Sequence, residues 1–394
     1  MSPKTRIVHV VSGLSMGGVS NMVFDLLKNC KSSNYEYLLV NLSGQGDESV
    51  VARLLNIGVR IENIPYEFQK GYSLIDYFKE AFFYGKNRNQ VAFDTVKSLK
   101  PDMLHFHTLP RELLFGKRVA KATGCELVYT DHTARIRKKD GSVVTRFLIR
   151  FPFMKFYSNC HVVAVSNPVL DYIRFFNIDR FVKSVQVVIN KINANPFRIS
   201  YMQKPELKVV YVSRILKAKG HYELIQAWAL LPPLGIHLYL IGPDELNGDL
   251  QKIVAELNVS NPVTFTGGVP NAVSLIEDAD FAVFPSHQEG LPLALLEKMQ
   301  IGLPCIVSDI PELKSIVTDL ENGLVFPVGD VVALANRITT LAKDIKLRSI
   351  LGTAAADHVE RFFVSKMGGI DKEYEEVYRK LLANQGHIDS QMEL

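Results

Sequence analysis

Short runs of consecutive apolar residues recur along the chain and predict buried β-strands. Continuous Val, Ile, Leu and Phe runs are typical of strands that a parallel sheet buries on both faces. Stretches with helical period lie between several of them, and the alternation starts again near residue 208. This pattern predicts an α/β fold with two doubly wound, Rossmann-like domains. The apolar runs are 6–11, 35–42, 59–64, 102–107, 126–130, 162–165, 184–189, 208–213, 237–241, 263–266, 281–285, 305–308 and 323–327.

The two alternating halves are separated by a segment without periodicity. Asn193-Ala194-Asn195-Pro196 and Lys204-Pro205 break the pattern there. We therefore expect an N-terminal domain at 1–195 and a C-terminal domain at 205–372. We also expect a final helix, at about 375–394, to pack back on the first domain. A chain of 394 residues suits two domains of this size.

Composition narrows the class of protein. A hydrophobic content of 47% with 22% charged residues is typical of a folded globular chain. No apolar run reaches the roughly 18–20 residues of a membrane-spanning helix, and the first apolar run reads as a strand rather than a signal peptide. The four cysteines are far apart and lack CxxC spacing. Reduced thiols in a cytoplasmic protein are the expected state.

Charge is distributed unequally between the two halves. Residues 1–200 carry 28 Lys and Arg against 16 Asp and Glu, a net charge of +12, whereas the remainder has a net charge of −8. A basic half joined to an acidic half suggests that the two domains bind different partners.

The most informative segment of the second half is a predicted strand followed by Glu289-Gly290-Leu291-Pro292 and then by Glu297. Ligands bind at the carboxyl ends of strands in an open α/β sheet, and proline suits a helix start. The N–H groups of Gly290, Leu291 and the first helical turn would form an anion site. Either glutamate alone suits an ordinary surface acid. Separated by roughly 10–12 Å along the chain, the two would hold opposite ends of a sugar nucleotide.

Two cations occupy a comparable position about 70 residues earlier. Arg214 ends a predicted strand and Lys219 precedes the next helix. Alone, this spacing suits solvated surface charge. Two cations fixed beside a pyrophosphate would neutralise the charge of a leaving group without a metal ion.

Together these segments resemble the retaining glycosyltransferases of family 4, which have the GT-B fold, two Rossmann-like domains facing a central cleft. The resemblance spans nearly the whole chain and is looser in the first 200 residues. The motifs that carry it are Glu289-x7-Glu297, Arg214-x4-Lys219-Gly220, the segment 302–309, Pro311-Glu312 and Asn322-Gly323.

The resemblance implies a role for each matched residue. Glu289 would contact the donor sugar near the reacting centre, and Glu297 would hold the ribose. Arg214 and Lys219 would stabilise the diphosphate. Val269, in a glycine-rich turn, would lie where the family packs the nucleobase, although a plain turn explains that segment nearly as well.

A D-x-D sequence, Asp278-Ala279-Asp280, has the form found in metal-dependent glycosyltransferases. A metal-binding pair should follow a strand, whereas this one precedes the run 281–285. We therefore interpret Asp280 as a structural residue and expect no metal cofactor.

The first domain begins with a strand and a glycine-rich loop that contains Gly17 and Gly18. The loop lacks the G-x-G-x-x-G order, which disfavours a dinucleotide site. A tight turn is one explanation, and the resemblance implies another, contact with the donor phosphates and acceptor. His132 ends a later strand, and the resemblance places its imidazole beside the donor sugar. His107 is expected to support structure.

Residues 135–157 interleave seven cations with five aromatic residues. Phosphates of an anionic membrane surface or of a lipid-pyrophosphate acceptor would suit such a segment. No nucleic-acid-binding signature accompanies it. A buried aromatic helix with solvated charges is the alternative. The cations assigned to the acceptor or membrane side are Arg137, Lys138, Lys139 and Arg146.

The sequence thus predicts transfer of a sugar, with retention, from a nucleotide-sugar to a hydroxyl acceptor. UDP is the expected carrier, and a lipid-linked or cell-surface glycan, as in polysaccharide or lipopolysaccharide biosynthesis, is the expected acceptor. The expected location is cytoplasmic, peripheral on the inner face of the cytoplasmic membrane. Two alternatives remain open: a sugar-nucleotide epimerase of the same architecture and a catalytically silent binding protein.

Overall fold

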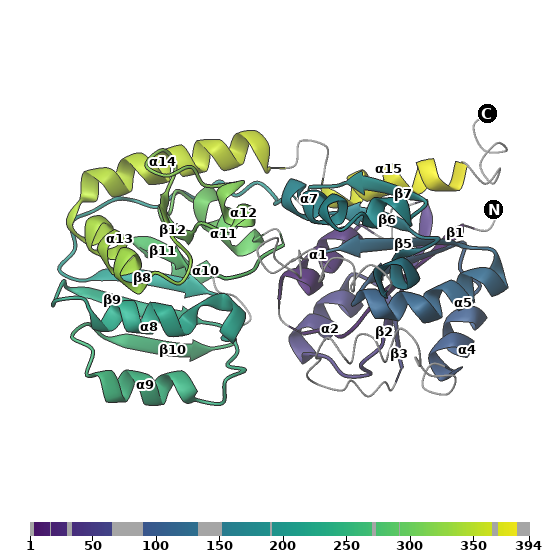
Figure 1. Ribbon diagram of the computed structural model, residues 1–394, viewed down its shortest axis with the longest axis horizontal. Coiled ribbons are helices and arrows are strands. Elements are labelled where there is room, and N and C mark those ends of the chain that lie inside the picture. The colour runs from purple at the N-terminus through teal and green to yellow at the C-terminus, as the bar shows by residue number, and fades with distance from the viewer. Residues whose placement is uncertain are drawn as a thin grey trace. The chain divides into compact units, whose positions relative to one another are not determined.

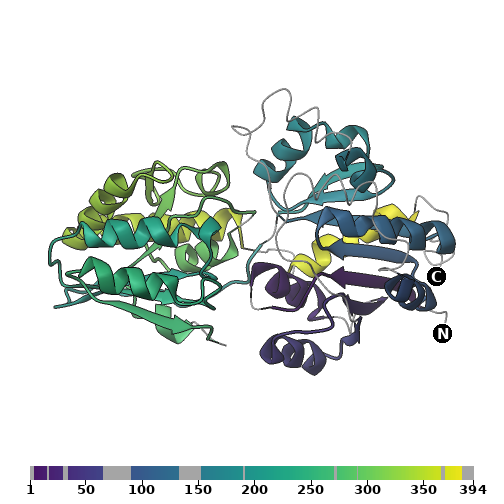
Figure 2. The same ribbon diagram turned by 60° about the horizontal axis from the view of Figure 1, so that its bottom comes forward.

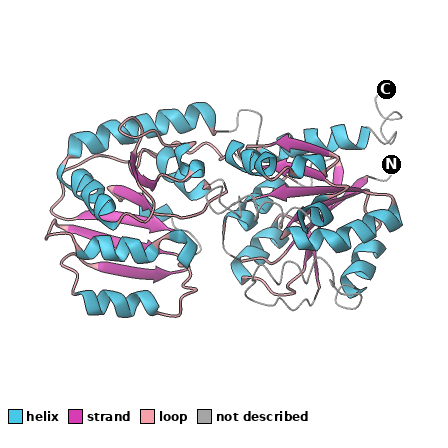
Figure 3. Cartoon of the chain, in the orientation of Figure 1, coloured by secondary structure: helices cyan, strands magenta, loops and turns pink. Residues whose placement is uncertain are grey.

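The computed structural model describes residues 4–15, 17–29, 34–64, 90–132, 152–189, 191–269, 273–290, 292–364 and 369–383. The chain divides into two compact units, one formed by Met1–Ile189 with Met367–Leu394 and the other by Asn190–Lys366. Each unit contains its own parallel sheet covered by helices (Figure 1, Figure 3).

Seven described strands form the sheet of the first unit, in the order β3-β2-β1-β4-β5-β6-β7. Neighbouring strands are all parallel. The chain builds outward in one direction from β1 and in the other from β4, so the order reverses between these two strands. Their bounds are β1 Thr5–Val11, β2 Tyr35–Asn41, β3 Arg60–Asn63, β4 Met103–His107, β5 Glu126–Asp131, β6 His161–Ala164 and β7 Ser184–Val187.

Helices cover both faces of the first sheet because successive strand side chains point to opposite faces. On β4, Phe106 packs edge-to-face on Phe115 of α5, whereas the neighbouring His105 meets Tyr378 of α15. Helix α15 also packs on α1 and lies against this sheet (Figure 2). The helices are α1 Gly18–Leu27, α2 Glu48–Asn56, α4 Gln90–Ser98, η2 Pro110–Glu112, α5 Leu113–Thr123, α7 Asn167–Phe175, η4 Ile178–Arg180 and α15 Ile370–Ala383.

Six described strands form the second sheet, in the order β10-β9-β8-β11-β12-β13. All its neighbouring strands are parallel as well. Here the order reverses between β8 and β11. The bounds are β8 Leu207–Val212, β9 Ile236–Ile241, β10 Val263–Gly267, β11 Phe281–Phe284, β12 Cys305–Ser308 and β13 Leu324–Phe326.

Helix α8 of the second unit packs on α9 and α13, and α11 packs on α14. Buried side chains from the sheet and these helices form one continuous core, with the single tryptophan, Trp228, fully buried in it. The bounds are η5 Lys217–Lys219, α8 His221–Ala229, α9 Asp249–Leu257, α10 Val273–Ile276, α11 Leu293–Gln300, α12 Pro311–Lys314, α13 Val331–Lys343 and α14 Ile345–Phe362.

The predicted fold class is confirmed. Each of the thirteen strands in the described part of the chain lies within two residues of a predicted apolar run. One difference concerns the C-terminal helix, which was expected at about 375–394. It begins at Ile370, and its described part ends at Ala383.

The described cysteines are buried and free of disulfide bonds. Burial raises the pKa of Cys125 to about 11 and that of Cys160 to about 12, so both remain thiols. Cys30 lies outside the described residues. None of the helices in the described ranges combines the length and the apolar character that crossing a membrane requires.

Candidate active site

The strongest candidate site lies where the strand order of the second sheet reverses. Strands β8 and β11 are direct neighbours there, so the loops that follow them leave the same edge of the sheet side by side. Ligands of open α/β sheets bind at such a reversal. One loop carries Arg214 and Lys219, and the other carries Glu289.

Lys219 and Glu289 form an ion pair between these two loops. Lys219 Nζ lies 2.6 Å from Glu289 Oε1, and Ser286 Oγ donates to the same oxygen at 2.7 Å. Only 21% of the lysine side chain and 12% of the glutamate side chain are exposed. The carboxylate is therefore held in one orientation by two donors in a partly dry site.

Tyr211 and Ser286 support this pair from within the sheet, and sequence reasoning missed both. Tyr211 Oη lies 2.8 Å from Lys219 O and 3.0 Å from Ser286 Oγ. Burial, and to a smaller extent the charge of Glu289, raises the pKa of Tyr211 far above its usual value, so the phenol remains protonated. A tyrosine at the end of an apolar run and a serine three residues before Glu289 were the available signals.

Gly220 brings the two loops into backbone contact. Its φ is +70°, and a Cβ atom at this position would lie 2.0 Å from Pro285 O. A second backbone contact joins the loops, because His287 N donates to Ala218 O at 2.9 Å. His287 Nε2 also lies 2.7 Å from Glu223 Oε1 on α8. The local geometry thus requires glycine directly after Lys219.

Arg214 lies in the same loop as Lys219 but makes a different contact. Its Nη1 atom lies 2.9 Å from Glu245 Oε1, and the two side chains are 43% and 48% exposed. An exposed ion pair contributes only about 0–1 kcal/mol. Arg214 can therefore exchange Glu245 for an anionic ligand at little cost.

Glu297 lies on α11 and is half exposed. Its Oε2 atom is 3.1 Å from the ammonium of Lys298, whose side chain is only 2% exposed. The hydrogen bond from this buried ammonium fixes the position of the carboxylate on the helix. Sequence reasoning identified the glutamate but not this partner.

The other residues predicted to bind the donor differ in how deeply they are buried. Pro292 is buried and lies at the start of α11, directly before its first helical residue. Gly290 is partly buried, and Leu291 lies outside the described residues. Val269 is partly buried and packs against the core of the second unit.

The D-x-D aspartates are structural, as interpreted from the sequence. Asp280 is buried and accepts hydrogen bonds from Lys208 N at 2.8 Å and Lys204 Nζ at 3.2 Å. Asp278 is exposed and pairs with Lys208 Nζ at 2.7 Å. These contacts attach the start of β11 to the start of β8, away from the edge that bears Glu289.

In the first unit, the glycine pair lies at the start of α1, after β1. Gly17 has an extended backbone and precedes the helix. Gly18 is exposed, and a Cβ atom there would meet nothing within 4 Å. Packing within the unit therefore does not explain Gly18, which leaves the predicted contact with a ligand untested. At the same sheet edge, Ser12 Oγ donates to Glu112 Oε2 at 3.0 Å.

His132 follows β5 and belongs to a cluster of histidines. Its Nε2 atom lies 3.3 Å from His107 Nδ1, and His107 Nε2 lies 3.0 Å from His9 Nδ1. The fourth member, His105, bonds Tyr378 Oη and Thr130 Oγ1, both at 2.7 Å. Sequence analysis identified His107 and His132 but not His9, whose signal was a polar residue inside an apolar run.

His9, His105 and His107 are the only group of possible metal ligands found among the described residues, with ligand atoms within 4.8 Å of one another. Burial lowers the pKa of all three histidines, to about 3 for His9. Both nitrogens of His105 and both of His107 already have hydrogen-bond partners. The three rings fit a neutral hydrogen-bonded cluster better than a metal centre.

The predicted acceptor-side cations, Arg137, Lys138, Lys139 and Arg146, lie outside the described residues. The described end of this segment agrees with the alternative interpretation, a buried aromatic helix. Phe153, Phe156 and Tyr157 are all buried, and Tyr157 Oη donates to Asp131 Oδ2 at 3.0 Å.

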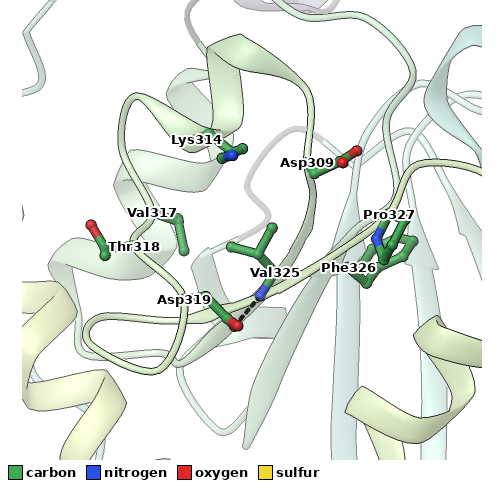
Figure 4. Close-up of a pocket in the computed structure, with 8 residues that line it drawn as sticks. All are labelled: Asp309, Lys314, Val317, Thr318, Asp319, Val325, Phe326 and Pro327. Atoms are coloured by element: carbon green, nitrogen blue, oxygen red, sulfur yellow. Dashed lines mark hydrogen bonds between the residues drawn. The ribbon is translucent and has the colours of Figure 1, made fainter.

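A surface pocket of about 400 Å³ lies elsewhere in the second unit, beside the ends of β12 and β13 (Figure 4). Exposed Asp309, Lys314 and Asp319 line it together with buried Phe326. None of the predicted site residues lines this pocket. The candidate site is therefore defined by the Glu289 loop and its partners.

Comparison with known proteins identifies the family. The family model described as glycosyl transferases group 1 matches residues 196–358, and the model for glycosyltransferase family 4 matches residues 16–194. The chain belongs to glycosyltransferase family 4. This glycosyltransferase is 27% identical to EpsD of Bacillus subtilis over 287 residues, which cover 68% of this chain and 74% of EpsD.

Two further likenesses are informative. The capsular polysaccharide biosynthesis glycosyltransferase CapM of Staphylococcus aureus is 30% identical over 175 residues, 44% of this chain and 46% of CapM. The chain thus matches about half the length of that relative. HepE of Anabaena, solved in complex with UDP and glucose, superposes with a TM-score of 0.75 at 18% identity, covering 95% of this chain and 100% of HepE. HepE therefore shares the fold.

Proposed function

We propose that this glycosyltransferase transfers a sugar from a UDP-sugar to a hydroxyl group of a lipid-linked or cell-surface glycan, with retention and without a metal cofactor. The observation that carries the proposal is the Glu289 carboxylate, held by Lys219 and Ser286 where the second sheet reverses. The complex of HepE with UDP and glucose supports the donor. The role of CapM in capsular polysaccharide biosynthesis supports the acceptor class.

Cationic side chains would hold the diphosphate of the donor, and carboxylates would hold its hydroxyl groups. An ammonium has three N–H donors, so Lys219 can keep its bond to Glu289 while it contacts a diphosphate oxygen. Arg214 would leave Glu245 to bind the same diphosphate, and Glu297 would hold the ribose. Glu289 would then contact sugar hydroxyls near the anomeric carbon.

Retention would follow from attack on the face that the diphosphate leaves. The bond between the anomeric carbon and the β-phosphate oxygen breaks, and a bond to the acceptor oxygen forms on the same face. The acceptor proton passes to an oxygen of the departing diphosphate. Arg214 and Lys219 stabilise the charge that develops there. We assign His132 to the reacting sugar, and Gly17 with Gly18 to the phosphates and acceptor.

The proposal includes metal independence because two side-chain cations, Arg214 and Lys219, would already stabilise the charge of the diphosphate. The aspartates of the D-x-D sequence are engaged in joining β8 to β11. If a divalent ion were required, activity would be lost in excess EDTA and recovered on adding magnesium or manganese.

A single assay tests the reaction. The purified chain is incubated with a panel of nucleotide-sugars and a membrane lipid extract in EDTA, and released nucleoside diphosphate and labelled lipid are measured. The coupling constant of the anomeric proton in the isolated product reports retention or inversion. An isomerised sugar would instead identify an epimerase, and no turnover with any donor would leave a binding protein.

The acceptor side is tested separately. We propose that Arg137, Lys138 and Lys139 draw the enzyme to the cytoplasmic face of the membrane, where a lipid-linked acceptor lies. The triple alanine variant should lose activity on membrane-bound acceptor and retain it on a soluble acceptor analogue. An equal loss on both would contradict the membrane role.

A further inference from the structure

Three imidazoles form a continuous line from the edge of the first sheet into its core. His132 follows β5, His107 ends β4, and His9 lies within β1. The contacts are 3.3 Å between His132 Nε2 and His107 Nδ1 and 3.0 Å between His107 Nε2 and His9 Nδ1. His105 lies beside this line, with both of its nitrogens engaged by Tyr378 and Thr130.

The inner members of the line are neutral. His9 is fully buried and His107 is 3% exposed, and burial lowers the pKa of both rings well below the usual value. A neutral imidazole has one N–H donor and one bare nitrogen that accepts. Each contact along the line must therefore join an N–H of one ring to the bare nitrogen of the next.

The inner end of the line sets its direction. His9 Nε2 is buried and has no hydrogen-bond partner among the described residues. A buried N–H without a partner is rarer in proteins than an unpaired acceptor. His9 therefore keeps its proton on Nδ1, where it donates to His107 Nε2. His107 must then carry its own proton on Nδ1 and donate to His132 Nε2.

We propose that His9 and His107 are positioning residues that fix the tautomer of His132, so that His132 accepts at Nε2 and carries its proton on Nδ1. The effect on sugar transfer rests on the proposed function, whereas the tautomer does not. With Nε2 engaged and Nδ1 protonated, neither nitrogen of His132 is a free base. His132 then orients the reacting sugar, and the acceptor proton leaves by way of the departing diphosphate.

The line does not serve as a proton relay. A relay needs a group at its inner end that passes the proton on. His9 instead ends among the aromatic rings of Tyr37 and Tyr378, whose centroids lie 5.6 Å and 6.2 Å from its own. The chain of hydrogen bonds is therefore a fixed support for His132.

The tautomer is measured directly on the full chain labelled with ¹⁵N-histidine. Long-range ¹⁵N–¹H correlations show which ring nitrogen carries the proton, and the spectrum of His132→Gln identifies the signals of His132. We expect a proton on Nδ1 of His132 in the wild type. A proton on Nε2 would overturn the proposal, and so would a bound zinc or nickel ion that shifts the signals of His9, His105 and His107 together.

Two variants of His9 test its influence. In His9→Phe the donor to His107 is lost, and His132 should become a mixture of both tautomers. In His9→Asn the amide nitrogen lies where Nδ1 was, so the wild-type tautomer should return. His237, which lies outside the cluster, provides the control variant His237→Asn. An unchanged His132 tautomer in a folded His9→Phe protein would contradict the inference.

Kinetics then separates this inference from the proposed function. We expect the kcat of His9→Phe to fall about 3- to 10-fold, the effect of one hydrogen bond, with the donor KM within twofold, and His9→Asn to recover most of it. An equal change in both variants would show that His9 acts through packing alone. If no sugar transfer is found at all, the proposed function fails, and the NMR result by itself still confirms or overturns the tautomer.

Discussion

Both units contain a parallel sheet whose strand order reverses once. The side chains at that reversal are charged in the second unit and mainly uncharged in the first. The second unit presents an ion pair, Lys219–Glu289, with a further cation, Arg214, exposed beside it. The first unit presents His132, which is backed by the buried, neutral imidazoles of His107 and His9. Charged groups near the surface suit a diphosphate, which needs cations. Neutral hydrogen-bonding groups suit a sugar, whose hydroxyls are uncharged.

The largest effect should come from Glu289. Under the proposed function it acts on the sugar near the reacting carbon, so Glu289→Gln should lower kcat about 100- to 1000-fold at saturating donor, the size expected for a preorganised electrostatic contact. Steady-state kinetics with varied donor measures this change.

Two matched variants sharpen the result. Glu297→Gln should raise the donor KM and leave kcat nearly unchanged, because Glu297 is assigned to hold the ribose. Glu256→Gln, at an exposed position of α9, should change neither. If Glu289→Gln altered only apparent donor affinity, its assigned place beside the anomeric carbon would be wrong.

The second effect is a difference in acid stability between the units. His9, His105 and His107 are buried and neutral in the first unit, whereas His221 alone is fully buried among the described histidines of the second, with a pKa lowered to about 4. The unfolded chain binds a proton at each of these histidines near pH 6.5, and the folded chain does not. Lowering the pH through 6.5 therefore stabilises the unfolded state.

The magnitude follows from proton linkage. Between pH 7 and 5.5 each such histidine should cost about 1 kcal/mol of unfolding free energy, so the first unit should lose about 3–4 kcal/mol and the second about 1 kcal/mol. Hydrogen exchange followed in peptides from each unit measures this difference. Equal losses in the two units would show that the cluster takes up protons while folded.

The sequence predicted the strands well because apolar runs depend on local composition alone. It also identified Glu289, Lys219 and Arg214, because their spacing belongs to a motif. It did not predict the contacts that support them. Tyr211 and Ser286 are 75 residues apart, and only the pairing of β8 with β11 brings them together. His9 was missed for the same reason, since it lies 98 residues from its partner His107 in the sequence.

The third effect concerns how tightly each loop is packed. Gly220→Ala would place a Cβ against Pro285 O at a positive φ, and should destabilise the second unit by about 2–4 kcal/mol. Gly329 has a similar φ of +81° but no neighbour within 4 Å. Gly329→Ala should therefore cost only about 1 kcal/mol in denaturant unfolding.

Gly18 allows the same substitution, glycine to alanine, to be tested in the first unit. It begins α1 and has open space around its Cβ position, so Gly18→Ala should leave stability nearly unchanged. A loss of activity in that stable variant would indicate that a ligand approaches the backbone there. Full activity would instead favour the simple turn.

The smallest effect should come from Ser286, which supports Glu289 as His107 supports His132. In Ser286→Ala, Lys219 still holds Glu289 Oε1, so we expect kcat to fall only about 3- to 10-fold, the value of one hydrogen bond. Ser315→Ala, whose hydroxyl bonds Glu312 O at an exposed site, is the control. The double variant with Glu289→Gln decides whether Ser286 acts through the carboxylate. If it does, removing Ser286 from Glu289→Gln should cost nothing further, whereas a second full loss would mean that Ser286 contacts the substrate itself.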